Sequence, residues 1–332
     1  MSAADKPLGA AVPKSFLARV ARSRETGIIL ALVIMVVALT VFAPDFATPG
    51  NMVNDARNFS FVGIVVIGQA MVMITGGIDL SVGSVWGLAA ISSAAFMNAG
   101  FGPVGGCLLA LVISGLVGLF NGLCVTKLRM PPFVPTLATM SIARALALVI
   151  TRGQSINNFL PDDSIFFNLG GGETFGLPNP FIVFVVLSII AGIVLSRTVY
   201  GRQLYAVGGN ERAARLTGLE VDRLKISVYV ISSVLAGLAG IIEVSYLSSA
   251  ISNQGFGKEL SVIAAAVIGG TALTGGEGTI LGVFVGAVIL EVLRNGLVLL
   301  GTDAYWQGVF VGSVIVLAVF IDQLRKGFWR TR

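Results

Sequence analysis

The sequence contains no histidine and few charged residues. Lys, Arg, Asp and Glu make up 12% of its 332 residues, whereas roughly 25% is usual in soluble domains. Without histidine there is no imidazole for acid–base catalysis or for metal binding. So few charges cannot coat a globule of this size with a hydrated surface. We therefore expect neither a soluble enzyme nor a metal site.

Cysteine is also scarce, because only Cys107 and Cys124 occur and both lie in one apolar stretch. Two isolated thiols give neither a metal cluster nor a disulfide framework, so we interpret them as packing residues. The net charge of +5 does not indicate nucleic acid. The basic residues lie at the edges of apolar runs, and no basic stripe with interleaved aromatics is present.

Apolar residues and glycine are abundant instead. The chain is 55% hydrophobic, contains 42 glycines without a G-X-Y period, and has a mean hydropathy of +0.91. About 20 apolar residues cross the hydrocarbon core of a bilayer. The sequence predicts an all-α, polytopic membrane helix bundle in contact with lipid, with about ten spans and glycine-broken helices. These spans are 27–43, 60–78, 82–99, 104–125, 133–151, 179–197, 225–246, 259–274, 278–299 and 304–321.

The basic residues predict how this bundle is oriented. With ten spans and a cytoplasmic N-terminus, most of the 22 Lys and Arg residues lie on the cytoplasmic side, as the positive-inside rule requires. The expected organisation is a basic cytoplasmic tail over 1–26, a transmembrane domain over 27–322 and a second basic cytoplasmic tail over 323–332. The polar loop 200–223 is expected on the same side.

A short internal echo links two glycine breaks. Ile74-Thr75-Gly76-Gly77 resembles Leu273-Thr274-Gly275-Gly276, 199 residues later, and the same offset places Gly83 on Gly282. Internal repeats are common in transporters, although frequent glycine also produces chance matches. Such breaks free backbone groups that protein or cavity water must satisfy. We expect most glycines to serve helix packing, as in the spacing of Gly115, Gly118 and Gly122.

Several polar residues lie within spans or beside breaks and are candidates for a translocation pathway. Polar and charged residues at membrane depth usually face the bundle interior or water. Asp79 is the first candidate, because it follows a glycine break. There its carboxylate could cap freed backbone N–H groups or contact a solute, and both roles stay open. The candidates are Gln69, Thr75, Asp79, Ser81, Asn121 and Glu243.

The loop 200–223 predicts a short helix. Asn210 is a good N-cap, Glu211 suits the first turn, and Gly218 is a natural stop after Thr217. Two turns are unstable alone, so the helix needs a surface to lie on. It packs on its own bundle or docks a cytoplasmic partner. The residues concerned are Gly209, Asn210, Glu211, Arg212, Ala213, Ala214, Arg215, Leu216, Thr217 and Gly218, with a small apolar patch from Ala213, Ala214 and Leu216 between Arg212 and Arg215.

Two of these motifs carry a family resemblance. Ile74-Thr-Gly-Gly-Ile-Asp-Leu-Ser-Val-Gly-Ser84 resembles the signature of permease subunits of ribose-type sugar ABC importers. Gly208-Gly-Asn-Glu-Arg-Ala-Ala-Arg-Leu-Thr-Gly218 resembles the ATPase-docking segment of that family. Ala239–Glu243 and Ile263–Gly276 match further stretches, and the resemblance runs from about residue 27 to residue 322. One departure is Ser261, where the family often has an acidic residue.

This resemblance implies a non-enzymatic subunit in the bacterial inner membrane, with both termini cytoplasmic. It implies a second copy or close relative, a cytoplasmic ABC ATPase subunit and a periplasmic sugar-binding protein. The chain lacks the phosphate-loop motif G-x-x-x-x-G-K-[ST], so ATP and Mg are expected on the ATPase and no cofactor on this chain. The expected function is import of a ribose-like pentose or related sugar or polyol by alternating access.

The residues alone leave other functions open. An ion-gradient-driven secondary transporter of small polar solutes could use Asp79 and Glu243 as ion sites. A channel or scaffold without coupled transport is a second alternative. A membrane-embedded enzyme is disfavoured, because no histidine, reactive cysteine pair or convergent carboxylate pair is evident. ATP dependence distinguishes the importer from the ion-driven carrier, and uptake distinguishes both from a scaffold.

Overall fold

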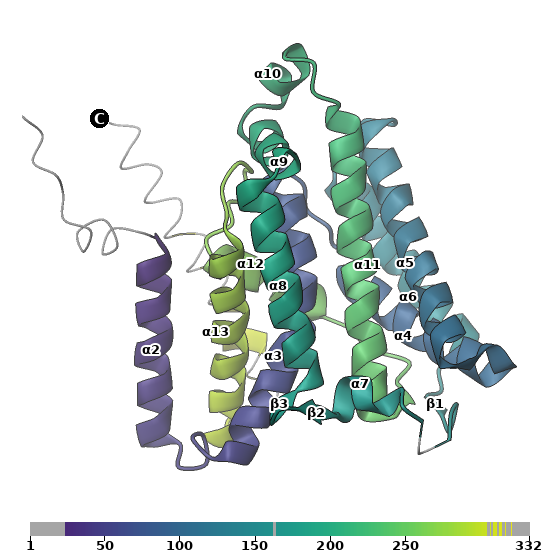
Figure 1. Ribbon diagram of the computed structural model, residues 1–332, viewed down its shortest axis with the longest axis vertical. Helices are drawn as coiled ribbons and strands as arrows, with labels where there is room; N and C mark the ends of the chain where they lie inside the picture. Colours follow the sequence, from purple (N-terminus) through teal and green to yellow (C-terminus); the bar gives the residue numbers. More distant parts are fainter. Residues whose placement is uncertain are drawn as a thin grey trace, which may run out of the picture.

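The computed structural model describes residues 24–161 and 164–303, together with residues 306, 308–310, 312–313, 316 and 320. They form a helix bundle (Figure 1). The helices are α2 (Arg24–Phe42), α3 (Pro49–Ile74), α4 (Val82–Phe96), the π-helix η1 (Met97–Phe101), α5 (Gly102–Thr126), α6 (Phe133–Thr151), α7 (Phe167–Gly171), α8 (Asn179–Arg197), α9 (Val199–Gly209), α10 (Glu211–Leu216), α11 (Val221–Leu247), α12 (Lys258–Ile268) and α13 (Ile280–Leu299).

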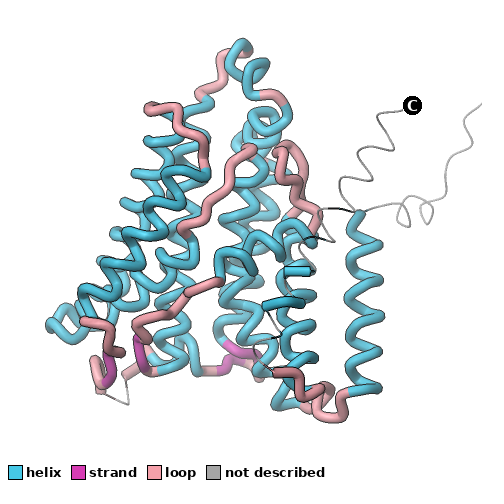
Figure 2. Tube along the Cα trace, turned by 180° about the vertical axis from the view of Figure 1, so that it is seen from behind, coloured by secondary structure: helices cyan, strands magenta, loops and turns pink. Residues whose placement is uncertain are grey.

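Strands occur only as two-residue pairs within the described part of the chain. β1 (Ile156–Asn157) pairs antiparallel with β4 (Ser249–Ala250), and β2 (Glu173–Thr174) pairs antiparallel with β3 (Leu177–Pro178). They lie at the end of the bundle opposite α10, as both views show (Figures 1 and 2). The predicted all-α class is confirmed, because these strands build no core.

The centre of the bundle is α3. Its residues 60–74 are all buried, and α8, α11, α12 and α13 pack around it. Phe184 of α8 stacks on Phe284 of α13 with ring centroids 4.7 Å apart, and Gly63 of α3 leaves room for the Phe184 ring. A helix that is apolar all round belongs in such a centre.

The outer helices expose their apolar side chains. Leu30 and Ile34 of α2, Val112 of α5, Val149 of α6 and Ile193 of α8 are all more than half exposed. Among the described residues, seven helical stretches are long and apolar enough to cross a membrane, one of them the continuous run 82–126. The protein is a polytopic membrane helix bundle whose outer surface suits lipid contact.

Several predicted spans agree closely with the structure. α6 and α8 coincide with 133–151 and 179–197, and α2, α11 and α13 lie within a few residues of their predicted bounds. The run 82–126 contains two predicted spans. Gly100 (φ 91°) and Gly102 (φ 69°) turn the chain between them, which only glycine does without strain.

The predicted span 60–78 needs correction at both ends. α3 begins at Pro49, whose ring suits the first helical turn. Its polar first half fits the bundle because its side chains have partners: Asn295 Nδ2 donates to Asn51 Oδ1 at 3.0 Å, and Arg57 lies 4.9 Å from the Tyr246 ring centroid. The helix ends at Ile74, just before the Thr-Gly-Gly break.

The predicted span 259–274 is also corrected. The structure has α12 there, only 11 residues long and ending at Ile268. That length covers about 16 Å, too little to cross the bilayer. The helix stops because Gly269 and Gly270 follow, the latter with φ 86°. The predicted span 304–321 and both predicted tails lie wholly or largely outside the described residues.

The two breaks of the predicted repeat lie in contact. Gly276 N–H donates to the carbonyl oxygen of Ile74 at 2.9 Å. The repeat-related glycines also share a role. A Cβ on Gly83 would lie 2.6 Å from the Gly255 carbonyl oxygen, and a Cβ on Gly282 would overlap the Gly269 carbonyl oxygen. At each of these two positions the lack of a side chain lets the glycine backbone pack directly on the backbone of another segment.

Candidate functional site

The segment 209–218 folds as its sequence predicts. Asn210 Oδ1 accepts a hydrogen bond from Ala213 N–H at 3.0 Å and so caps α10. Thr217 Oγ1 donates to the Ala214 carbonyl oxygen, and Gly218 (φ 83°) ends the helix in a left-handed conformation. α10 lies at the tip of the bundle (Figure 1). Capping alone does not hold two turns in place, so the tertiary contacts of α10 matter.

Ion pairs hold α10 on the bundle. Arg215 Nη2 lies 2.9 Å from Glu211 Oε1 and 2.8 Å from Asp222 Oδ1. Lys225 Nζ lies 2.6 Å from Glu211 Oε2, and Lys127 Nζ lies 2.9 Å from Asp222 Oδ2. Arg215 and Glu211 thus connect α10 to α11, and Asp222 of α11 extends the network to Lys127 at the end of α5. Single exposed ion pairs contribute about 0–1 kcal/mol, and linked ones contribute more reliably.

The network shifts the ionisation of its members. Partial burial raises the pKa of the Glu211 carboxyl, but hydrogen bonds and charges from Lys225 and Arg215 outweigh burial, so the pKa lies below its ordinary value. Hydrogen bonds to Asp222 and then to Glu211 raise the pKa of the Arg215 guanidinium. Both shifts favour the charged forms that bind α10 to the bundle.

The predicted apolar patch on α10 is wrong in its composition. Ala214 is buried against the bundle, while Ala213 is exposed and Leu216 is 89% exposed. The side chains diverge because Ala214 and Leu216 are two residues apart, which places them on opposite sides of a helix. Ala214 therefore supports α10, and Leu216 points away from the bundle.

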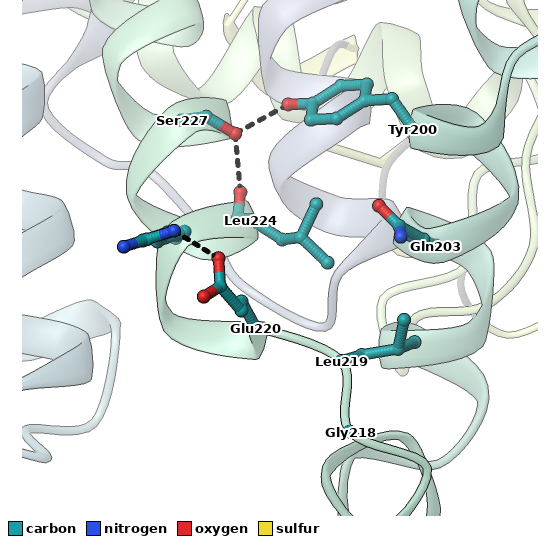
Figure 3. A pocket seen from close by; sticks show the side chains of 8 residues that line it. Tyr200, Gln203, Gly218, Leu219, Glu220, Leu224 and Ser227 are labelled. Atoms are coloured by element: carbon teal, nitrogen blue, oxygen red, sulfur yellow. Dashed lines mark hydrogen bonds and ion pairs between the residues drawn. The ribbon is translucent and has the colours of Figure 1, made fainter.

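A pocket of about 370 Å³ lies beside the end of the segment, between α9 and the start of α11. Figure 3 shows Tyr200 and Gln203 of α9 facing Leu224 and Ser227 of α11. The Tyr200 hydroxyl and Ser227 Oγ are 2.6 Å apart. The pocket combines an apolar floor with hydroxyl, amide and charged groups, and sequence reasoning missed it.

Three of the predicted pathway residues meet in one buried network. Asp79 Oδ1 accepts hydrogen bonds from Ser81 N at 2.9 Å and Ser81 Oγ at 2.6 Å. Asn121 Nδ2 donates to Ser81 Oγ at 3.1 Å. Two unpredicted residues complete it: Ser232 Oγ donates to Asp79 Oδ2 at 3.2 Å, and Thr139 Oγ1 donates to Asn121 Oδ1 at 2.9 Å. Asp79 therefore does cap a backbone N–H group freed by the break.

The other three candidates lie apart from this network. Glu243 Oε2 accepts from Trp86 Nε1 at 2.7 Å and from Gln254 Nε2 at 2.5 Å. Thr75, the first residue of the break, donates from Oγ1 to the Val72 carbonyl oxygen in the last turn of α3. Gln69 is fully buried, and its amide has no hydrogen-bond partner among the described residues. The sequence identified polar residues at depth but not which of them meet.

Comparisons with known proteins cover nearly the whole chain. The model of the family described as branched-chain amino acid transport system / permease component matches residues 51–319. Ribose import permease protein RbsC of Bacillus subtilis (strain 168) is 40% identical over 304 residues, covering 92% of this chain and 94% of that protein. RbsC of Escherichia coli (strain K12) is 38% identical over 299 residues, covering 90% and 93%.

A further relative is named for another sugar. The L-arabinose transport system permease protein AraH of Escherichia coli (strain K12) is 36% identical over 323 residues, which cover 97% of this chain and 98% of that protein. No solved structure gives a significant match to the chain.

Proposed function

Because this chain belongs to the family of branched-chain amino acid transport system permease components, we propose that it is the membrane conduit of an ATP-driven sugar importer. The solute is a monosaccharide, namely a ribose-like pentose or a related sugar or polyol. Support comes from the relatives named for ribose and for L-arabinose, which are both pentoses and match over most of the chain. The chain is a transporter subunit and not an enzyme.

ATP and Mg bind to a separate cytoplasmic ABC ATPase, which docks on residues 209–218, from here on called the docking segment. The exposed Leu216 at the tip of the capped helix α10 is the observation that carries this assignment. Its large apolar side chain points away from the bundle, where a partner surface can cover it. The absence of a phosphate-loop motif in this chain agrees with hydrolysis on another subunit.

The α10 end of the bundle faces the cytoplasm, and the strand end faces a periplasmic sugar-binding protein. Lys127, Arg202, Arg212 and Arg223 at the α10 end support this orientation, with both termini on the cytoplasmic side of the bacterial inner membrane. A second copy of the permease, or a close relative, completes the conduit. Movement of the docking segment switches the pair between outward-open and inward-open states.

The network around Asp79 contributes to the pathway of the solute. Asp79, Ser81, Asn121, Thr139 and Ser232 come from four separate parts of the chain and are all buried. Buried polar groups that hydrogen-bond mainly to one another can replace these bonds with bonds to sugar hydroxyls when the conduit opens. Gln69 and Thr75 remain further candidates for this pathway. Glu243 is a weaker one, because its carboxylate already accepts from Trp86 and Gln254.

Co-purification tests the proposal. The tagged chain is extracted from native membranes in mild detergent, and the co-purifying chains are identified by mass spectrometry. We expect a stoichiometric partner with a phosphate-loop motif. The variant Leu216→Asp should co-purify at least tenfold less of this partner. The control Phe175→Asp changes a side chain that is 98% exposed at the opposite end and should retain it.

Two outcomes would contradict the proposal. A chain that emerges alone, under conditions that hold a known transporter complex together, would favour an ion-gradient-driven carrier instead. Full retention of the ATPase by Leu216→Asp would show that α10 is not the docking site, even if the importer assignment holds.

A further inference from the structure

Gly208, the residue just before the docking segment, lies against both Thr-Gly-Gly breaks at once. A Cβ at this position would overlap the carbonyl oxygen of Ile74 and would lie 2.5 Å from the backbone nitrogen of Gly276. Those two atoms form the 2.9 Å hydrogen bond that joins the breaks. The end of α9 therefore packs on the bond between the breaks without space for a single methyl group.

The surrounding backbone is equally close. A Cβ on Gly275 would lie 2.9 Å from Gly76 N and 3.1 Å from Gly208 O, and one on Gly276 would lie 3.1 Å from Gly209 Cα. Gly76, Gly275 and Gly276 have φ values of 79°, 86° and 77°, which L side chains rarely adopt. Three segments far apart in the sequence thus meet backbone to backbone, and we call this meeting point the glycine junction (residues 74–77, 208–209 and 275–276).

A side chain adds a second link from α9. The Tyr205 hydroxyl donates to the Gly278 carbonyl oxygen at 2.6 Å. Tyr205 lies one helical turn before Gly208, so α9 is fixed to the second break at two successive levels. The second break leads directly into α13, and the first leads directly to Asp79.

The docking segment connects to this junction through one residue. Asn210 is the C-cap of α9 and the N-cap of α10, with φ −160° and ψ 97°. No loop lies between α9 and α10 that could absorb a displacement. A movement of α10 therefore displaces α9, and α9 cannot move without displacing both breaks, because close-packed backbone does not deform continuously.

We propose that Gly208 and Tyr205 are positioning residues that transmit movement of the docking segment to both Thr-Gly-Gly breaks. This inference rests on the proposed function, since it assumes that an ATPase moves the docking segment. Gly208 keeps α9 seated on the hydrogen bond between the breaks, and Tyr205 keeps α9 aligned with the second break. The first break then carries the movement to the Asp79 network and the second carries it to α13.

The chain offers a matched pair of variants for the test. Gly208→Ala introduces a methyl group that has no space, whereas Gly192→Ala, in the helix α8 that precedes α9, places its methyl group 3.9 Å from Ile280 Cβ, an ordinary contact. Each variant is co-purified with the ATPase that accompanies the wild-type chain and is reconstituted into proteoliposomes. The measured quantities are bound ATPase, ATP hydrolysis, and uptake of D-ribose or L-arabinose, whichever the wild type transports.

We expect Gly208→Ala to retain the ATPase but to lower the ratio of uptake to ATP hydrolysis at least tenfold. Gly192→Ala should change that ratio less than twofold. A purely structural defect would lower the amount of complex and leave the ratio unchanged. Tyr205→Phe, which loses only the hydroxyl, should lower the ratio about threefold. Its control Tyr200→Phe loses the bond to Ser227 instead and should have no effect on the ratio.

The outcomes separate this inference from the function on which it rests. A wild-type chain that binds no ATPase refutes both. A Gly208→Ala variant with the wild-type ratio of uptake to ATP hydrolysis, or an equal fall of that ratio in Gly208→Ala and Gly192→Ala, refutes the inference alone. If Gly208→Ala does not reach the membrane, the comparison of Tyr205→Phe with Tyr200→Phe decides, and equal ratios in these two variants would overturn the inference.

Discussion

Trp86 of α4 donates its indole N–H to Glu243 Oε2 of α11 across 2.7 Å. Gln254 Nε2 donates to the same oxygen, and Trp86 is fully buried. One carboxylate thus satisfies two donors from different parts of the chain. This arrangement favours a structural role for Glu243 over direct contact with the solute.

Replacing Glu243 tests that role. Glu243→Ala leaves the indole N–H without an acceptor, which costs about 1–3 kcal/mol, and we expect the unfolding temperature in detergent to fall by several degrees. Glu243→Gln keeps an acceptor oxygen and should lose less than half as much. The measurement is thermal denaturation followed by fluorescence-detected size exclusion. A Glu243→Gln variant of wild-type stability but without uptake would place Glu243 on the pathway instead.

The Asp79 network gives a second prediction. Asp79→Ala leaves the backbone N–H of Ser81 and the hydroxyl of Ser232 without their acceptor, so we expect a marked loss of folded protein in the membrane. Asp79→Asn keeps one acceptor oxygen and should fold, but uptake should fall severalfold. Ser92→Ala is the control, because the buried Ser92 hydroxyl has no hydrogen-bond partner in the described residues. Normal uptake and assembly in Asp79→Asn would remove Asp79 from the pathway.

The lowered pKa of Glu211 predicts how the attachment of α10 depends on pH. A carboxyl whose pKa is lower in the folded state contributes stability above its ordinary value of 4.5, and loses it as pH falls through the lower value. The attachment should therefore be unchanged between pH 7 and pH 5 and should weaken below about pH 4.5. Hydrogen exchange of the purified chain at residues 211–216 measures this.

A substitution at neutral pH provides the matched comparison. Glu211→Gln removes the ion pairs with Lys225 and Arg215, so trypsin should cleave at Arg212 and Arg215 severalfold faster. Glu220→Gln removes only the exposed pair with Arg223 and should leave the cleavage rate unchanged. Equal rates in the two variants would mean that the ion pairs do not hold α10.

Two glycines of α5 give a prediction about helix packing. A Cβ on Gly118 would lie 2.5 Å from the Tyr229 carbonyl oxygen of α11, whereas one on Gly115 would lie 3.5 Å from a Val234 methyl group, an ordinary contact. Gly118→Ala must separate α5 from α11 and should lower the unfolding temperature by several degrees. Gly115→Ala should leave it unchanged or raise it. The reverse order would show that these helices do not approach through Gly118.

The sequence predicts those parts of the fold that local signals determine. α6 and α8 are bounded as predicted because an apolar run ends there at a loop or an arginine. α10 is predicted because Asn210 and Gly218 act on the backbone at their own positions. The start of α3 is missed, because its Asn and Arg residues are typical of a loop until their partners Asn295 on α13 and Tyr246 on α11 are known. α12 is predicted too long because hydropathy continues past the glycines that end the helix.

The buried network is predicted only in part for a related reason. Asp79 and Asn121 are unusual inside apolar runs and attract notice in the sequence. Thr139 also bonds to the Pro135 carbonyl oxygen one turn earlier in its own helix, which is common for hydroxyl residues in helices, so a threonine there carries little information. Which polar residues meet depends on how the helices pack, and a single sequence does not state this.

α2 packs mainly on α13, with Leu39 lying against Gly296, and the match to the family model begins only after α2 has ended. The ribosome completes α2 long before it starts α13. At about 5–20 residues per second, the interval is on the order of tens of seconds. During that time α2 lies in the bilayer without its principal neighbour. α2 is apolar around its whole circumference, and its Leu30, Ile34, Val37 and Val41 are more than half exposed even in the folded chain. It is therefore stable in lipid before α13 is made, whereas the polar first half of α3 is stable there only once its partners in the rest of the chain are in place.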